Sequence, residues 1–164
     1  MTIAPYGSWK SPITSDLIVK EMIGLSQPRL DGEDIYWIEM RPSERGRQVI
    51  VRRSADEATT DINPAEFNAR TRVHEYGGGD YVVHDGAVYF SNFSDQQLYR
   101  QNAGPAPERI TTECSDDRLR YADTVFDLAR DRLICVREDH RQADREAENT
   151  IAAVSLKGEA ESVL

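Results

Sequence analysis

One pattern recurs three times along the chain: a polar turn centred on aspartate, followed by a short strand of large apolar residues. When Ile35 is superposed on Val88 and then on Leu133, the repeats lie 53 and 45 residues apart. Repeats of about 40 to 50 residues are typical of propeller blades, each of which holds four strands. The three copies are Leu30 to Trp37, His84 to Phe90 and Ala129 to Cys135.

The rest of the chain also favours strands. Short segments rich in β-branched and aromatic residues are bounded mostly by Gly, Asp, Asn, Pro or Ser, and no window carries a convincing helical apolar stripe. A β-sandwich would also give short strands, but it does not predict the recurrence of turn and strand. The expected strands are Ile35–Met40, Gln48–Arg52, Tyr81–His84, Ala87–Ser91, Gln97–Arg100, Leu133–Val136 and Ile151–Leu156.

We therefore predict an all-β fold, a partial β-propeller of about three four-stranded antiparallel blades in a single domain. Propellers close with about four to eight blades, so three blades predict a fragment of something longer. Unpaired strand edges at both ends of such a fragment invite self-association with another copy. The expected parts are an N-terminal segment (1–22), a first blade (23–72), a second blade (73–118) and a third, truncated blade (119–164).

A glycine-rich motif lies between the first and second repeats, in the segment Arg70 to Asp80. Its three consecutive glycines neither pack a core nor favour a strand, because glycine has no side chain and loses the most backbone entropy on folding. A tight hairpin entry with solvated flanks is the simplest interpretation. A phosphate-binding P-loop is disfavoured because Asp80 and a strand follow the glycines, rather than Lys-Ser/Thr and a helix.

Composition excludes several classes of protein. With a net charge of −9 and a pI near 4.8, the chain lacks the basic surface that nucleic-acid binding requires. No apolar run reaches the length of a signal peptide or of a membrane-spanning helix, so we expect a cytoplasmic protein that does not bind membranes.

Metal and cofactor binding are not expected either. His74, His84 and His140 are scattered along the sequence, without the spacing of metal ligands. Cys114 and Cys135 have no second pair of cysteines, and we interpret them as free thiols.

Two motifs together make the chain resemble a known family. Tyr6 to Asp16 (YGSWKSPITSD) and Asn68 to Gly79 (NARTRVHEYGGG) are similar to the opening of prolyl oligopeptidase-family serine peptidases, in the branch of acylaminoacyl-peptidase-like and dipeptidyl-aminopeptidase-like enzymes. The resemblance covers essentially the whole chain. It implies an amino-terminal propeller, usually of seven blades, that caps a carboxy-terminal α/β-hydrolase domain carrying a Ser-His-Asp triad.

The catalytic machinery of that family is missing from this chain. A hydrolase nucleophile sits in a Gly-x-Ser-x-Gly elbow, and Ser26 comes nearest, with Gly24 before it but Pro28 after it. Without nucleophile, base and oxyanion hole, acyl transfer has no route. We expect no catalytic residues and no peptide hydrolysis by the chain alone.

The resemblance instead implies gating of access and binding of peptide substrate ends for the absent hydrolase domain. By position, the glycine motif supplies the contacts to substrate or to that domain. We expect Glu75 to pair with a basic group, either a substrate amine or an arginine of the hydrolase domain, because an unpaired buried carboxylate is costly. A stand-alone interaction propeller that closes its ring by oligomerisation is the alternative. The candidate site residues are Arg70, Arg72, His74, Glu75, Tyr76, Gly77, Gly78 and Gly79.

Overall fold

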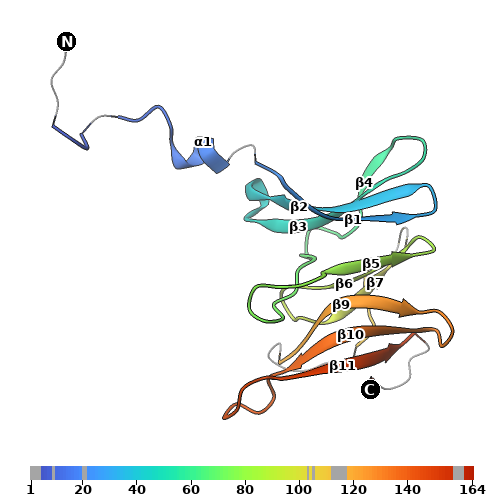
Figure 1. The fold of residues 1–164 in the computed structure, drawn as a ribbon. Coiled ribbons are helices and arrows are strands. Elements are labelled where there is room, and N and C mark those ends of the chain that lie inside the picture. Colours follow the sequence, from blue (N-terminus) through green and yellow to red (C-terminus); the bar gives the residue numbers. More distant parts are fainter. Residues whose placement is uncertain are drawn as a thin grey trace.

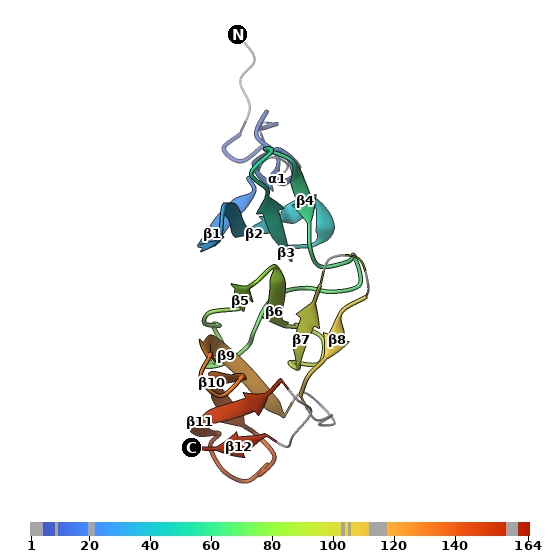
Figure 2. The same ribbon diagram turned by 90° about the vertical axis from the view of Figure 1, so that its right-hand side faces the viewer.

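The computed structural model describes residues 5–8, 10–19, 22–102, 104, 106–111, 118–156 and 161–164. It confirms the predicted fold class, with three four-stranded antiparallel sheets and very little helix. In each sheet the strands are hydrogen-bonded in chain order, and the three sheets lie one beside the next, as expected of a partial propeller (Figure 1, Figure 2).

Each sheet is a meander of four consecutive strands. The first sheet consists of β1 (Gly24–Asp31), β2 (Asp34–Arg41), β3 (Arg47–Arg53) and β4 (Thr59–Asp61). The second sheet consists of β5 (Tyr81–His84), β6 (Ala87–Ser91), β7 (Leu98–Gln101) and β8 (Glu108–Arg109). The third sheet consists of β9 (Leu119–Asp127), β10 (Arg132–Asp139), β11 (Glu148–Ser155) and β12 (Ser162–Val163).

Among the described residues, helical structure is confined to α1 (Ser15–Val19) before the first sheet and a 3-10 turn, η1 (Pro42–Glu44), between β2 and β3. Neither of these, nor any other helix in the described ranges, has the length and apolarity to cross a membrane.

The recurring aspartate turn joins the first strand of each sheet to the second. Gly32 and Glu33 connect β1 to β2, Asp85 and Gly86 connect β5 to β6, and residues 128–131 connect β9 to β10. The sequence repeat therefore corresponds to one hairpin per sheet, at the same place in each meander.

Two hydrophobic cores lie between neighbouring sheets. Because side chains alternate across a strand, β2 directs one set of residues toward the second sheet and the other set away from it. Burying a large apolar side chain in such a core stabilises the fold by roughly 1.5 to 3 kcal/mol. The core between the first and second sheets contains Tyr36, Ile38, Ile50, Ala69, Tyr81, Val88 and Phe90. The core between the second and third sheets contains Ala87, Tyr89, Leu98, Leu119, Tyr121, Leu133, Cys135, Ala152 and Val154.

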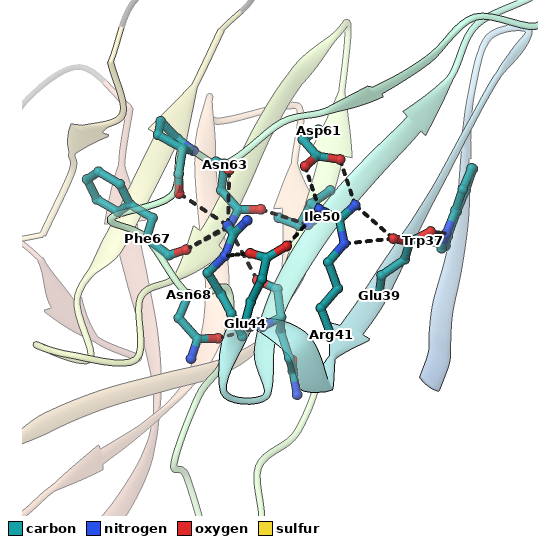
Figure 3. Close-up of polar contacts among 12 residues, drawn as sticks. Trp37, Glu39, Arg41, Glu44, Ile50, Asp61, Asn63, Phe67 and Asn68 are labelled. Atoms are coloured by element: carbon teal, nitrogen blue, oxygen red, sulfur yellow. Dashed lines mark hydrogen bonds and ion pairs between the residues drawn. The ribbon is translucent and has the colours of Figure 1, made fainter. Parts of the chain in front are cut away.

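A polar network fastens the last strand of the first sheet and the segment that follows it (Figure 3). The guanidinium of Arg41 donates to both carboxylate oxygens of Asp61, at 2.6 and 2.7 Å, and also to Glu39. Asn63 Oδ1 accepts a 2.7 Å hydrogen bond from the backbone N–H of Ile50. The connection to the second sheet therefore leaves β4 in a fixed direction.

Two strands that the sequence did not predict, β1 and β9, each contain a β-bulge. In β1 two residues beginning with Gln27 face Trp37, and in β9 two residues beginning with Asp123 face Cys135. Both Gln27 and Asp123 have positive φ, 51° and 54°, which bends the strand locally. Both bulges contact the glycine motif.

Cys135 is a buried free thiol, as predicted. Burial raises its pKa to about 12, so the reactive thiolate is disfavoured. Cys114 lies outside the described residues.

Candidate functional site

The segment from Arg70 to Asp80, called the glycine loop below, connects the first and second sheets. Both of its ends are hydrogen-bonded to Ser91 of β6. The N–H of Arg70 donates to the Ser91 carbonyl, and the N–H of Ser91 donates to the Asp80 carbonyl, each at 2.9 Å. The residues between Arg70 and Asp80 therefore form a loop whose two ends lie together at Ser91.

The base of the glycine loop is tied to the first sheet through the carboxylate of Asp80. This side chain is buried and accepts hydrogen bonds from the N–H of Thr71, at 2.6 Å, and from Gln27 Nε2, at 2.5 Å. In return, Gln27 Oε1 accepts from the N–H of Asp80 at 2.9 Å. The bulge of β1 thus presents one side-chain amide that pairs with both the carboxylate and the backbone N–H of Asp80.

Gly78 and Gly79 approach the bulge of β9 in the third sheet. The N–H of Gly79 donates to Asp123 Oδ1 at 2.7 Å, and the N–H of Asp123 donates to the Gly79 carbonyl at 2.9 Å. A Cβ at either glycine would lie 2.9 Å from an oxygen of Asp123, which is too close. The surface that the glycines approach is therefore part of this chain.

Gly77 has a different role, because its φ of 91° lies in the left-handed region that glycine adopts without strain. Just before it, His74 and Glu75 also have positive φ, 55° and 66°. Non-glycine residues adopt this conformation only when the surroundings hold them there.

The tip of the glycine loop is held by Arg120 of β9. Its Nη1 donates to Glu75 Oε1 at 2.7 Å, to the Arg72 carbonyl at 3.1 Å and to Glu138 Oε2 at 3.3 Å. The hydrogen bond from Arg120 lowers the pKa of Glu75. The basic partner of Glu75 is thus an arginine of this chain, not the substrate amine or hydrolase arginine that we expected.

A buried carboxylate, that of Glu138, completes this cluster. It is 5% exposed, and it accepts hydrogen bonds from the N–H of His74 at 3.1 Å and from His140 Nε2 at 2.7 Å. Two of the three histidines that look scattered in the sequence therefore meet at one carboxylate. Neither Arg120 nor Glu138 was singled out from the sequence.

The other candidate residues lie on the surface of the glycine loop. Arg70 and Arg72 both stack over the ring of Phe93, with centroid distances of 5.1 and 5.3 Å. Tyr76 is 89% exposed, and its ring lies 6.5 Å from that of His74. A tip that is fixed by ion pairs but leaves an aromatic ring in solvent can contact another molecule without first becoming ordered.

The third histidine lies elsewhere. Among the described residues, His84, Asp31 and Asp85 form the group whose side chains could reach one metal ion. The Asp31 carboxylate already accepts hydrogen bonds from the N–H groups of Asp85 and Gly86, at 3.2 and 2.6 Å. We therefore interpret this group as a cap on the turn between β5 and β6.

Solved structures of peptidases are similar to nearly the whole chain. A puromycin-hydrolyzing peptidase from Mycobacterium tuberculosis is 36% identical, with a TM-score of 0.80, over 98% of this chain and 26% of that protein. A puromycin hydrolase mutant complexed with PGG is 33% identical, with a TM-score of 0.82, over 96% of this chain and 25% of that one. Puromycin hydrolase itself is 33% identical, with a TM-score of 0.82, over 98% of this chain and 26% of that one.

The chain thus spans about a quarter of the length of these solved proteins. No protein-family model and no curated protein matches it.

We predict that Gly79→Ala lowers the free energy of unfolding by about 1 to 3 kcal/mol, because the new methyl group would overlap Asp123. Denaturant unfolding measures the effect. A double-mutant cycle with Asp123→Ala should recover about 1 kcal/mol of the loss, since that change removes the overlapping carboxylate. Strictly additive effects would contradict the assigned contact.

The pH dependence of stability should report on Asp80. Burial raises its pKa to about 6, although the hydrogen bonds from Thr71 and Gln27 favour the carboxylate. An unfolded aspartate has a pKa near 3.9, so between about pH 4 and 6 only the folded state holds the proton. The free energy of unfolding should therefore fall through that window as pH rises, by up to about 3 kcal/mol.

The measurement is urea unfolding of the native chain and of Asp80→Asn at pH 4, 5, 6 and 7. The difference between the two proteins should change between pH 4 and 6 and level off above pH 6. A difference that is equal at all four pH values would show that Asp80 does not titrate in this way.

Proposed function

We propose that the chain is the amino-terminal propeller part of a prolyl oligopeptidase-family serine peptidase, in the acylaminoacyl-peptidase-like or dipeptidyl-aminopeptidase-like branch. Two observations support this assignment: the opening and glycine motifs, and at least 33% identity to puromycin-hydrolysing peptidases over nearly the whole chain. The share of those proteins that is covered, about a quarter, leaves ample length for a separate hydrolase domain.

In this proposal the chain is not catalytic. Its sequence contains no Gly-x-Ser-x-Gly elbow, so it contributes access control and contacts to the ends of peptide substrates. The cytoplasmic location inferred from the sequence stays a prediction.

The glycine loop is the part of the chain that we assign to substrate or domain contact. The observation that carries this assignment is the combination of a fixed backbone and an exposed ring. Arg120 holds the tip through Glu75, at 2.7 Å, while Tyr76 remains 89% exposed. Aromatic side chains on rigid supports are typical anchors of binding surfaces.

A chimera tests the proposal. This chain would replace the corresponding quarter of the Mycobacterium tuberculosis puromycin-hydrolyzing peptidase, and puromycin hydrolysis would be measured. We expect the chimera to be active and the 164-residue chain alone to show no hydrolysis. In the chimera, Tyr76→Ala should raise the KM about three- to tenfold, because one aromatic contact is lost.

Leu30→Ala provides the matched control, because Leu30 is also exposed, at 76%, but pairs with Ile35 of β2 and not with the glycine loop. Glu75→Gln should act in the same direction as Tyr76→Ala, since it weakens the pair with Arg120. If both loop variants keep the KM and the domain docking of the parent chimera, the glycine loop has no role in substrate binding.

A second candidate function, an interaction propeller that closes by oligomerisation, is favoured by the open face of the first sheet. Leu25, Pro28, Ile35 and Trp37 line an apolar groove there of about 320 Å³. In the repeat, Ile35 corresponds to Val88, which the first sheet buries to 1% exposure, whereas Ile35 itself is 40% exposed.

The far face of the third sheet is also apolar and exposed, with Val125 at 57% and Ile151 at 48%. In the second candidate function, the third sheet of one copy covers the first sheet of another. Two copies would then supply six sheets, a number within the range of closed propellers.

Light scattering on the isolated chain distinguishes this candidate. We expect a dimer at micromolar concentration that Ile35→Glu converts to a monomer, because the variant places a charge on the apolar groove. Tyr76→Glu is the control: it also introduces a glutamate at an exposed residue, but Tyr76 does not line the groove, so the dimer should remain intact. A monomer at every concentration would rule the candidate out.

A further inference from the structure

The first and second sheets repeat one cross-strand pair, a tyrosine opposite an arginine. Tyr36 of β2 is the register partner of Arg52 of β3, and Tyr89 of β6 is the register partner of Arg100 of β7. The two pairs therefore occupy equivalent places in the repeat, each beside a cleft that leads in between neighbouring sheets.

In the first sheet the arginine is neutralised. Asp34 Oδ2 accepts from Arg52 Nε at 2.8 Å and forms an ion pair with its Nη2 at 2.7 Å. Asp34 is the first residue after the two-residue turn, where it pairs with Asp31 across the hairpin.

In the second sheet the carboxylate is missing from that place. The first residue after the corresponding turn is Ala87, which pairs with His84. Arg100 thus lacks the partner that Arg52 has, although each arginine has the same register relative to its tyrosine.

No residue in the described ranges replaces that partner. The Arg100 guanidinium stacks over Tyr89 at 5.8 Å, and its Nε is buried without a hydrogen-bond acceptor. Glu108 is its neighbour across β7 and β8, yet among the described residues Arg100 forms no ion pair with it. A half-buried guanidinium in this situation favours an anion supplied from outside.

The cleft beside Arg100 has a volume of about 250 Å³ and lies between the second and third sheets. One wall is apolar, formed by Phe126, Leu128 and Leu156. The ring of Phe126 packs edge-on against Tyr89, with centroids 5.1 Å apart. A ligand here would therefore meet a cation and an apolar surface side by side.

The other polar groups of the cleft restrict the ligand further. His84 and Asn102 can donate hydrogen bonds, whereas Asp85 and Asp131 add negative charge to the lining. Those two carboxylates disfavour a ligand with two or more negative charges.

We propose that this cleft binds a small organic monocarboxylate with an apolar body, whose carboxylate pairs with Arg100 as Asp34 pairs with Arg52. The apolar body lies against Phe126 and Leu128. This site is separate from the glycine loop, and the inference does not rest on the proposed function.

The test is an NMR titration of the ¹⁵N-labelled chain with phenylacetate, with its uncharged analogue phenylacetamide and with inorganic phosphate. We expect phenylacetate to shift the Arg100 side-chain Nε–H signal and the Leu128 amide, with millimolar affinity. Phenylacetamide and phosphate should each bind at least about tenfold more weakly. Phenylacetamide loses the charge-assisted hydrogen bond, and phosphate loses the apolar contact.

Two variants complete the design. Ala87→Asp places in the second sheet the carboxylate that the first sheet has, so it should neutralise Arg100 and reduce phenylacetate affinity about tenfold. Arg100→Gln should do the same by removing the cation. Backbone signals far from the cleft report whether each variant is folded, and if Ala87→Asp is not, Arg100→Gln decides alone.

The proposal is overturned if phenylacetate fails to bind, or if phenylacetamide or phosphate binds equally well. It is also overturned if a folded variant at either position keeps the affinity of the native chain.

Discussion

Asp80 and the glycines before it lie between two bulged strands, β1 of the first sheet and β9 of the third. On one side the Gln27 amide pairs with the carboxylate and the backbone N–H of Asp80. On the other side Gly79 exchanges two hydrogen bonds with Asp123. Because these contacts join three sheets within a few residues, the packing of the sheets and the shape of the glycine loop depend on each other.

The two bulges explain why the approach is so close. In a regular strand, successive side chains point to opposite faces of the sheet. At Gln27 in β1 and at Asp123 in β9, a positive φ breaks this alternation and turns the strand. The side-chain amide of Gln27 and the carboxylate of Asp123 then accept hydrogen bonds from the backbone of the glycine loop. Side-chain atoms of Asp123 occupy the space where Gly78 and Gly79 would have carried a Cβ.

The sequence predicted the fold class because the aspartate turn repeats and because the strand segments either alternate apolar and polar residues or are apolar throughout. It did not predict β1 or β9, since Gln27 and Asp123 interrupt the two-residue alternation at the bulges. The glycine motif was recognisable as a special backbone. Its contacts were not, because Gln27, Arg120 and Glu138 are distant in sequence and no local pattern connects them to the motif.

The glycine loop is anchored at two different sheets. Its base is bound to the first sheet through Gln27, and its tip is bound to the third sheet through Arg120 and Glu138. The loop thus acts as a strap across the end of the second sheet. Any change in the angle between the first and third sheets therefore has to pull on this strap, and Tyr76 at its tip would move with the curvature of the propeller.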